Sequence, residues 1–509
     1  MSLTQYLHRG KRLHPTKPAL IFEDRVTTYA ELHDKVALWA GAYSRLGLPK
    51  GSRVCILSSN TDHSILAFLG AIWGGLLPIF MNCRWSIAEL SDSVDDCSAA
   101  LLVADDSFME TAVTVRERCP SIQAVVSIGV PEAAPHGVRH HAQLLRDSTP
   151  LPDSSTTAQA PAFLNYTGGT TRKGKGVVHS HGGFASSMAI LLWEGYVVKG
   201  STCLTVPLFH IAGISVLMSA LMAGNSLSIL PRFEPEQLLR TIQKHRIHQV
   251  FMVPTMLRMM LENPTFASHD LSSLGLVRYG GSPIDDALIR KLRSMLPHVE
   301  LMQLYGQTEG IPISMLSHAD HDDRAVATGR TQSAGLPVMG VDLAIRGPAG
   351  ETLPANAVGE ISLRGPHLML EYWHDPEQTR TALRDGWLYT GDAGYLCEHG
   401  YLHIVDRIKD MIVSGGENIY SAEVENALNS HPAVLQSAVV GLPDERWGEI
   451  VHAEVVFKPG CTSTTGELDD HCRALIAGYK IPKSITFASE LPLTSVGKLD
   501  KVSIREKYA

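Results

Sequence analysis

A segment rich in glycine and threonine, residues 166–176, restricts the fold of this chain more than any other part of its sequence. Its order, YTGGTTRKGKG, combines four glycines, three threonines and three basic side chains. Glycines allow positive φ and let backbone N–H groups converge on a ligand, while hydroxyls and a lysine ammonium suit phosphate. Apolar residues 162–164 and 177–178 flank the segment and predict a strand on each side. The sequence therefore predicts a phosphate-binding loop between two strands, with a basic hairpin turn as the alternative.

The spacing from Gly169 to Lys175 also matches the G-x-x-x-x-G-K core of a Walker A loop. That motif requires Ser or Thr after the lysine to hold Mg²⁺, and a helix that begins at once. In this chain Gly176 follows, and two β-branched residues come next. A Walker-type NTPase is therefore disfavoured.

The composition is that of an ordinary globular enzyme. The 509 residues predict two or three domains, with 44% hydrophobic and 19% charged residues. A net charge of −8 argues against a general nucleic-acid binder. The eight cysteines form no C-x-x-C pair, which favours a reduced compartment without a zinc site or a disulfide framework. No signal peptide is visible, so a cytoplasmic location is expected.

Two uncharged apolar stretches, residues 65–81 and 203–230, have the composition of membrane spans. Glycines and a proline break the first, and Pro207 and His210 cut the second early. The remaining apolar run has about the length of a buried core helix rather than of a bilayer crossing. We expect both stretches to lie in the core and expect no transmembrane segment.

The pattern along the chain predicts an α/β fold. Its first third alternates apolar strands such as 53–57 with amphipathic helices such as 29–46 and 64–73, which favours mostly parallel sheets with flanking helices. From residue 340 onward the strands become shorter, which indicates a small barrel-like β subdomain. The charged run 406–410 marks a boundary, and the roughly one hundred residues after it suffice for an α+β domain. We therefore expect an N-terminal domain (1–405), a hinge (406–410) and a small mobile C-terminal domain (411–509).

Seven patterns, in this order and at these separations, resemble motifs of the adenylate-forming superfamily of acyl-CoA synthetases, stand-alone adenylation domains and beetle luciferases. They are residues 166–176, 207–210, 280–283, 305–310, 389–392, 406–423 and 493–498. The resemblance covers nearly the whole chain and implies a two-step reaction. A carboxylate attacks the α-phosphate of Mg·ATP to give an acyl-adenylate and pyrophosphate, and a thiol, usually that of coenzyme A, then displaces AMP.

The resemblance also implies roles for residues of the ATP site. The residues implied to hold the β- and γ-phosphates are Thr167, Gly168, Gly169, Thr170, Thr171 and Lys175. Glu309 would ligate Mg²⁺, with Thr308 near the α-phosphate. Tyr305 would stack on adenine, and the residues along the edge of the base would be Gly280, Gly281 and Ser282. Asp392 would accept hydrogen bonds from the ribose hydroxyls, assisted by Arg407.

In the C-terminal domain, the resemblance implies that Lys498 bridges the attacking carboxylate and the α-phosphate. The domain would rotate between the two half-reactions about the hinge residue Lys409. Rotation would move Lys498 out of the active site and bring in a glycine loop that contains Gly415 and Gly416. This loop would lie beside the tunnel for the pantetheine arm of coenzyme A. Trp447 would stack on the adenine of CoA, and two candidates for its phosphates are Arg84 and Lys483.

The phosphate loop departs from the family pattern at three positions. Gly168 replaces a serine, Arg172 stands where glycine is usual, and Gly174 stands where proline is usual. Because arginine adopts positive φ only at a cost, the loop either has a different shape or gains a phosphate contact through Arg172.

The acid is expected to be a monocarboxylate with an apolar body, either fatty or aryl. Relatives that activate amino acids usually have an Asp near the position of Phe209, and this chain has none there. No basic residue occurs within residues 203–230 or 305–316. A second carboxylate against those walls would be unpaired, at a cost of several kcal/mol. His210 is a candidate for the acyl pocket or its mouth, with a core histidine as the alternative. The alternative functions are an enzyme that loads a carrier protein and a non-catalytic nucleotide- or acyl-binding relative; the sequence also allows a homodimer.

Overall fold

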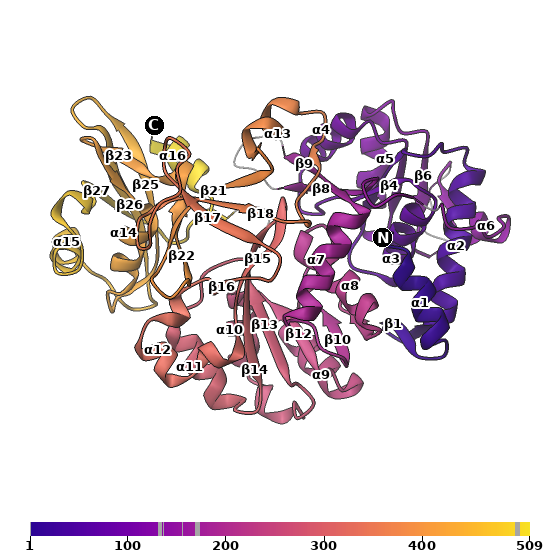
Figure 1. Ribbon diagram of the computed structural model, residues 1–509, viewed down its shortest axis with the longest axis horizontal. Coiled ribbons are helices and arrows are strands. Elements are labelled where there is room, and N and C mark those ends of the chain that lie inside the picture. The colour runs from indigo at the N-terminus through magenta and orange to yellow at the C-terminus, as the bar shows by residue number, and fades with distance from the viewer. Residues whose placement is uncertain are drawn as a thin grey trace. The chain divides into compact units, whose positions relative to one another are not determined.

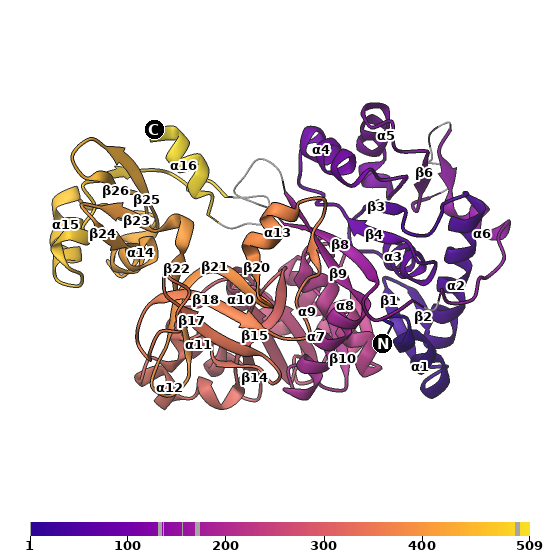
Figure 2. The same ribbon diagram turned by 45° about the horizontal axis from the view of Figure 1, so that its top comes forward.

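The computed structural model describes residues 2–130, 135, 137–154, 156–167, 174–493 and 499–508. They form two compact units, one of residues 1–343 with 363–388 and one of residues 344–362 with 389–509. The hinge expected at 406–410 lies inside the second unit, and its role as a hinge stays a prediction. The α/β class is confirmed, and the elements are shown in Figure 1 and Figure 2.

A nine-stranded sheet forms one half of the first unit, in the order β16-β15-β14-β13-β12-β10-β11-β1-β2. Its strands are β1 (Pro18–Phe22), β2 (Arg25–Thr28), β10 (Ser201–Leu204), β11 (Ser226–Ile229), β12 (Gln249–Met252), β13 (Leu276–Gly280), β14 (Glu300–Gln307), β15 (Gly310–Leu316) and β16 (Leu336–Pro337). The six strands from β14 to β1 are parallel, and the sheet ends in antiparallel strands on both sides. Their carboxyl ends therefore meet along one edge, where open α/β sheets bind ligands.

An eight-stranded sheet forms the other half, in the order β19-β9-β8-β4-β3-β5-β6-β7. Its strands are β3 (Arg53–Leu57), β4 (Leu77–Phe80), β5 (Leu101–Ala104), β6 (Ala124–Ser127), β7 (Arg139–His140), β8 (Pro161–Thr167), β9 (Lys175–Ser180) and β19 (Glu371–Tyr372). The strands predicted on either side of the glycine-rich segment are β8 and β9, which pair antiparallel.

Helices flank both sheets, as the alternating pattern predicted (Figure 1). They are α1 (Gln5–Leu13), α2 (Tyr29–Arg45), α3 (Asp62–Trp73), α4 (Ile87–Cys97), α5 (Met109–Arg118), α6 (His141–Arg146), α7 (His181–Trp193), α8 (Ile211–Ala223), α9 (Pro235–His245), α10 (Pro254–Leu261), α11 (Asp286–Met295), α12 (Asp323–Ala327) and α13 (Pro376–Ala382). Short 3₁₀ helices are η1 (Asp106–Phe108), η3 (Phe266–Ser268), η4 (His318–His321), η5 (Arg330–Gln332), η6 (Ile408–Asp410) and η7 (Gly478–Lys480). Helix α2 begins where predicted because Thr28 and Glu31 form a capping box.

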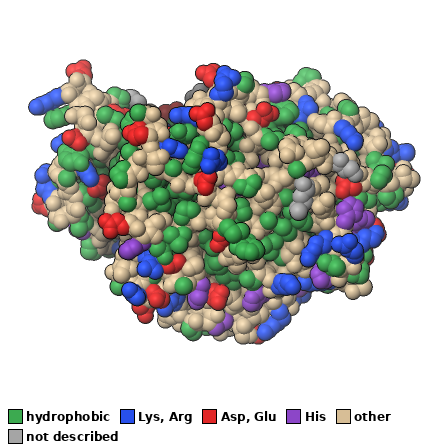
Figure 3. Space-filling model, in the orientation of Figure 1, with side chains coloured by type: hydrophobic (Ala, Val, Ile, Leu, Met, Phe, Trp, Pro, Cys, Tyr) green, Lys and Arg blue, Asp and Glu red, His purple; other side chains and the backbone are tan. Residues whose placement is uncertain are grey.

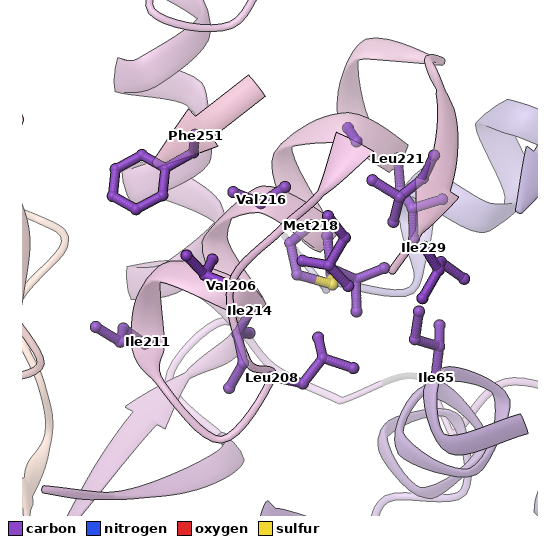
Figure 4. Close-up of a cluster of buried hydrophobic side chains, with 14 of the residues drawn as sticks. Ile65, Val206, Leu208, Ile211, Ile214, Val216, Met218, Leu221, Ile229 and Phe251 are labelled. Carbon is purple, nitrogen blue, oxygen red and sulfur yellow. The ribbon is translucent and has the colours of Figure 1, made fainter. Parts of the chain in front are cut away.

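The two uncharged stretches lie in the core, as predicted. Residues 65–81 run through α3 and β4, and residues 203–230 run through α8 and β11. Figure 4 shows side chains from both stretches, among them Ile65, Ile214 and Ile229, meeting in one buried cluster with Phe251 of β12. Among the described residues, no helix combines the length and the apolar content that a membrane crossing requires.

The chain after residue 340 forms two smaller sheets, which agrees with the predicted change to short strands. One has the order β17-β18-β21-β20, with β22 paired to β21. Its strands are β17 (Asp342–Arg346), β18 (Gly359–Arg364), β20 (Leu383–Arg384), β21 (Trp387–Leu396) and β22 (Leu402–Arg407). The other has the order β24-β23-β26-β25, with β27 paired to β26. Its elements are β23 (Ile412–Ser414), β24 (Glu417–Ile419), α14 (Ser421–Asn429), β25 (Val434–Asp444), β26 (Gly448–Phe457), α15 (Thr465–Arg473), β27 (Ser484–Phe487) and α16 (Lys501–Tyr508). On the molecular face in Figure 3, acidic and basic side chains are interspersed.

Candidate active site

The β8–β9 hairpin positions the two ends of the glycine-rich segment. Thr167 and Lys175 lie opposite each other as the last paired residues of the two strands. The candidates Gly168, Gly169, Thr170 and Thr171, and also Arg172, lie outside the described residues. Thr167 and Lys175 thus lie where the chain enters and leaves the predicted phosphate loop.

Tyr372 links Lys175 to Glu309 within the first unit. Strand β19 pairs with β9, so that Tyr372 lies opposite Val177. The Nζ atom of Lys175 is 4.7 Å from the centroid of the Tyr372 ring. The Tyr372 hydroxyl donates a hydrogen bond of 2.8 Å to Oε1 of Glu309. Burial, followed by the charge of Glu309, raises the pKa of Tyr372, so the hydroxyl stays protonated at neutral pH and acts as the donor.

Sequence reasoning did not find Tyr372. It lies 63 residues from Glu309 in the chain, and only the β9–β19 pairing brings it beside Lys175. No local pattern distinguishes this tyrosine from any other aromatic residue in a short strand. The tertiary structure alone identifies it as a candidate site residue.

The predicted adenine-binding residues meet at the carboxyl ends of β13 and β14. Gly280 pairs with Leu304, the residue before Tyr305, and this pairing places Gly281 and Ser282 beside the end of β14. A Cβ atom on Gly280 would lie 2.3 Å from the carbonyl oxygen of Leu304, so a larger residue would separate the strands. Gly281 has a φ of +81°, which turns the chain sharply after the strand.

Thr308 and Glu309 form the turn between β14 and β15. The carbonyl oxygen of Glu309 accepts a hydrogen bond of 2.8 Å from the N–H of Met369, which fixes the turn. A hexacoordinate Mg²⁺ is usually held by one or two carboxylates together with substrate phosphates. Among the described residues no group of three or more His, Cys, Asp or Glu could hold a metal. A role of Glu309 as a ligand of Mg²⁺ bound to ATP stays a prediction.

His210 caps helix α8. Its Nδ1 atom accepts a hydrogen bond of 3.1 Å from the N–H of Ala212, at the first turn of the helix. The side-chain amide of Asn165, on β8, donates to the carbonyl oxygen of Phe209 at 2.9 Å and joins this segment to the strand before the phosphate loop. The capping role was not predicted from the sequence, and a place for His210 in an acyl pocket stays a prediction.

In the second unit, Asp392 and Arg407 lie opposite each other on the antiparallel strands β21 and β22. The Nε atom of Arg407 is 3.1 Å from Oδ1 of Asp392. The aspartate side chain is 8% exposed and the arginine side chain is 52% exposed. The carboxylate is therefore the buried member of the ion pair and the guanidinium is the exposed one. The hydroxyl of Thr390 accepts a hydrogen bond of 3.0 Å from the N–H of Asp392 and holds the strand locally.

The structure also brings together two residues predicted to bind coenzyme A. The N–H of Gly415 donates a hydrogen bond of 2.8 Å to the carbonyl oxygen of Trp447. A Cβ atom on Gly415 would approach the Trp447 ring to 2.8 Å, and both Gly415 and Gly416 have positive φ. The indole is 42% exposed, and the guanidinium carbon of Arg446 lies 5.0 Å from its centroid.

The remaining candidates are dispersed. Lys409 lies in η6, where burial lowers its pKa, next to an ion pair of 2.9 Å between Asp410 and Arg505. Arg84 is exposed in the connection between β4 and α4 of the first unit, and Lys483 is exposed before β27 of the second. Lys498 lies outside the described residues.

Tyr305 lies on β14 near the carboxyl ends of the parallel strands, and Glu309 follows in the next turn. Tyr372 connects Glu309 to Lys175, where the glycine-rich segment between β8 and β9 ends. This arrangement is typical of a nucleotide-binding α/β enzyme. Comparison with known families identifies it more closely. A family model described as "AMP-binding enzyme" matches residues 7–373, and one described as "AMP-binding enzyme C-terminal domain" matches residues 423–498. The chain therefore belongs to the family of AMP-binding, adenylate-forming enzymes, as its motifs indicated.

Three known proteins illustrate the range of this similarity. The fatty acid–[acyl-carrier-protein] ligase ScoC of Streptomyces coeruleorubidus is 35% identical over 97% of this chain and 94% of its own length. A feruloyl-CoA synthase of an Amycolatopsis species is 35% identical over 98% of both chains. The solved structure of the amide bond synthetase McbA from Marinactinospora thermotolerans matches with a TM-score of 0.89 and 30% identity over 100% of both chains. The three names differ in the product that they state: an acyl-carrier-protein conjugate, a CoA conjugate and an amide.

Proposed function

We propose that this chain is an ATP-dependent acid–thiol ligase. It converts a carboxylic acid with an apolar body, fatty or aryl, into an acyl-adenylate and then into a thioester of coenzyme A. One observation carries the proposal: Gly280 pairs with Leu304, the neighbour of Tyr305, and Tyr372 joins Glu309, in the turn after β14, to Lys175 at the end of the predicted phosphate loop.

In the first half-reaction an anion attacks a polyanion, so positioning and charge neutralisation dominate. The residues proposed to hold the β- and γ-phosphates are Thr167, Gly168, Gly169, Thr170, Thr171 and Lys175. Glu309 would hold Mg²⁺, whose charge neutralises the phosphates when it is bound. Tyr372 fixes one oxygen of Glu309 and leaves the second for the metal.

The nucleoside is oriented by residues of rigid strands. Tyr305 stacks on the adenine, while Gly280, Gly281 and Ser282 offer backbone groups along its edge. Asp392 accepts the ribose hydroxyls, and Arg407 keeps the carboxylate oriented. Thr308 stands near the α-phosphate, where Lys498 adds positive charge to the developing pentavalent centre.

The second half-reaction requires a different set of residues. We propose that residues 411–509 rotate against 1–405 about 406–410, with Lys409 as the hinge residue. The glycine turn at Gly415 and Gly416 then replaces Lys498. Trp447 stacks on the adenine of CoA, since its indole is 42% exposed and its backbone carbonyl oxygen is held by the N–H of Gly415.

The acceptor distinguishes the two leading functions. Coenzyme A is favoured by the exposed Trp447 with Arg446 over its ring. A holo-carrier protein is the second candidate, because the ligase ScoC, which is 35% identical, is named for that acceptor.

The test is AMP release by the full-length enzyme with fatty, benzoic, cinnamic and branched acids, each with CoA or a holo-carrier protein. We expect a thioester with CoA and ATP–pyrophosphate exchange without any thiol. Exchange at background for every acid would refute the proposal. Trp447→Ala should raise KM for CoA and leave the exchange unchanged, while Tyr479→Ala, which changes another exposed aromatic residue of the same unit, should alter neither.

A further inference from the structure

Arg278, in the middle of β13, is a buried cation that has no acidic partner among the described residues. Its side chain is 1% exposed. Within the described part of the chain, its Nε and Nη2 atoms have no hydrogen-bond partner. Burial lowers the pKa of the guanidinium to about 10, so it remains charged at neutral pH. Burying a charged group without a partner is strongly unfavourable, so this cation needs an explanation, such as a bound ligand, water or ion.

The groups around Arg278 are aromatic and apolar. Parallel pairing places it between Phe251 of β12 and Met302 of β14, on the same face of the sheet. The guanidinium carbon lies 5.3 Å from the ring centroid of Tyr196, a cation–π contact. The Tyr196 side chain is 2% exposed, and its hydroxyl also lacks a partner among the described residues. Two neighbouring side chains thus present unsatisfied polar groups in the interior.

The segment that carries Tyr196 is fixed over this face of the sheet. The side-chain amide of Gln249 bonds both the N–H and the carbonyl oxygen of Val198, at 3.3 and 2.6 Å. The amide of Asn225 donates to the same carbonyl oxygen at 2.8 Å. Gln249 pairs with Leu276, two residues before Arg278, so its side chain and that of Arg278 share one face. The position of Tyr196 over Arg278 is therefore built by hydrogen bonds and is not incidental.

Arg278 lies on the same strand as part of the proposed nucleotide site. Gly280, the first proposed adenine contact, follows two residues later on the same face of β13, about 7 Å along the strand. The acyl group of an acyl-adenylate is carried on the 5′-phosphate of AMP, and it would approach the guanidinium by running back along this face of the sheet. The sequence argument for an apolar acyl site considered residues 203–230 and 305–316, and Arg278 lies outside both ranges.

We propose that Arg278 and Tyr196 form the distal end of the acyl site and bind an oxygen acceptor at the far end of an otherwise apolar acid. The acceptor is a ketone, a phenolic oxygen or a second carboxylate, and the shared chemistry is a lone pair that accepts from the guanidinium and the hydroxyl. The inference rests on the proposed function and narrows its substrate class. Without such an oxygen, the site keeps its unsatisfied donors, and the bound acid loses affinity.

The first test compares matched acids in ATP–pyrophosphate exchange. The aryl series is 3-phenylpropanoate with hydrogen, methyl, hydroxyl, acetyl or carboxylate at the para position. The aliphatic series pairs straight-chain acids of increasing length with the corresponding dicarboxylic acids. We expect kcat/KM to favour an acceptor-bearing acid over its matched hydrocarbon by roughly 10-fold or more. Arg278→Met should reverse that preference and Tyr196→Phe should weaken it, while Arg246→Met, at an exposed arginine, should preserve it. A preference for the hydrocarbon acids throughout, or an unchanged ratio in Arg278→Met, would overturn the inference.

The second test needs no turnover. If Arg278 awaits a ligand, Arg278→Met should raise the melting temperature of the free protein, because it removes an uncompensated buried charge. If the arginine only packs on Tyr196, the same change should lower it, which counts against the inference. Acceptor-bearing acids should raise the melting temperature of the wild type more than that of Tyr196→Phe. That shift would persist even if exchange failed with every acid, so failure of the proposed function and failure of this inference give different results. Should Arg278→Met fail to fold, an equal shift in the wild type and Tyr196→Phe would refute the inference.

Discussion

The Tyr372 hydroxyl lies 2.8 Å from Oε1 of Glu309 and donates a hydrogen bond to it. The same ring lies beneath the ammonium group of Lys175, so one side chain connects the end of the phosphate loop with the proposed metal ligand. Both contacts depend on β19 pairing with β9. A disturbance at Tyr372 should therefore affect the binding of Mg²⁺ and of the phosphates together.

Removing only the hydroxyl separates these two roles. Tyr372→Phe keeps the ring beneath Lys175 and frees the oxygen of Glu309 that Tyr372 holds. We expect roughly 10-fold slower pyrophosphate exchange and a higher Mg²⁺ requirement, because a hydrogen bond to a charged group is lost. Tyr372→Leu removes the ring as well and should also raise KM for ATP. Equal Mg²⁺ titrations for wild type and Tyr372→Phe would show that the hydrogen bond does not position the carboxylate.

The Asp392–Arg407 pair yields a prediction about the ribose. Asp392→Asn retains the shape but replaces the acceptor charge, so hydrogen bonds from the ribose hydroxyls should weaken by about 1.5–3 kcal/mol. We expect KM for ATP to rise by roughly 10- to 100-fold. The decisive measurement is KM for 2′- and 3′-deoxy-ATP, which the wild type should discriminate against and the variant should not. Undiminished discrimination in Asp392→Asn would assign the ribose to other residues.

The hinge proposal predicts different effects on the two half-reactions. Lys409 lies in the 3₁₀ helix η6, whose φ values are compatible with proline. Lys409→Pro should fold in this conformation and then resist rotation, because the ring locks φ at about −65°. One half-reaction, measured as pyrophosphate exchange or as thioester formation from isolated acyl-adenylate, should fall much more than the other. Lys409→Ala is the control for the lost side chain, and a Lys409→Pro enzyme active in both steps would rule out Lys409 as the hinge.

Local patterns in the sequence were sufficient to predict much of the fold. The strands beside the glycine-rich segment and the helix starting at Tyr29 follow from turn residues, a cap and apolar periodicity. For residues 411–509 the sequence predicted only an α+β domain, and not the long hairpin of β25 and β26. Residues 442–444 of β25 pair with residues 448–450 of β26, so the backbone groups of these polar ends hydrogen-bond each other. The composition of either strand alone does not reveal this pairing.

The candidate site was predictable only where its residues belong to contiguous motifs. Tyr372 was not predicted as a site residue because its partners lie on distant strands. The burial of Arg278 was not predicted because an arginine within a strand usually points to solvent. Its lack of hydrogen-bond partners depends on the side chains that β12, β14 and Tyr196 place around it. His210 was noticed as a motif residue, but its role as the cap of α8 required the backbone.

Buried histidines of the first unit predict loss of stability in acid. Burial lowers the pKa of His179 to about 3, and that of His321 and His367 to about 4, from 6.5. Above pH 6.5 these rings are neutral in both the folded and the unfolded chain and add no pH dependence. Below it the unfolded chain binds protons that the folded chain refuses, so the free energy of unfolding falls by about 1.4 kcal/mol per pH unit for each ring, down to the folded pKa.

Denaturant titrations across this pH range, followed by fluorescence of the buried Trp39 and Trp73, measure the slope. His179 stacks on Phe163 at 4.7 Å and its Nε2 has no partner among the described residues, so His179→Phe should reduce the slope by one histidine's share. His318→Asn, at an exposed histidine, is the control and should leave the slope unchanged. A stability that does not fall between pH 6.5 and about 4 would mean that the buried rings are protonated in the folded chain.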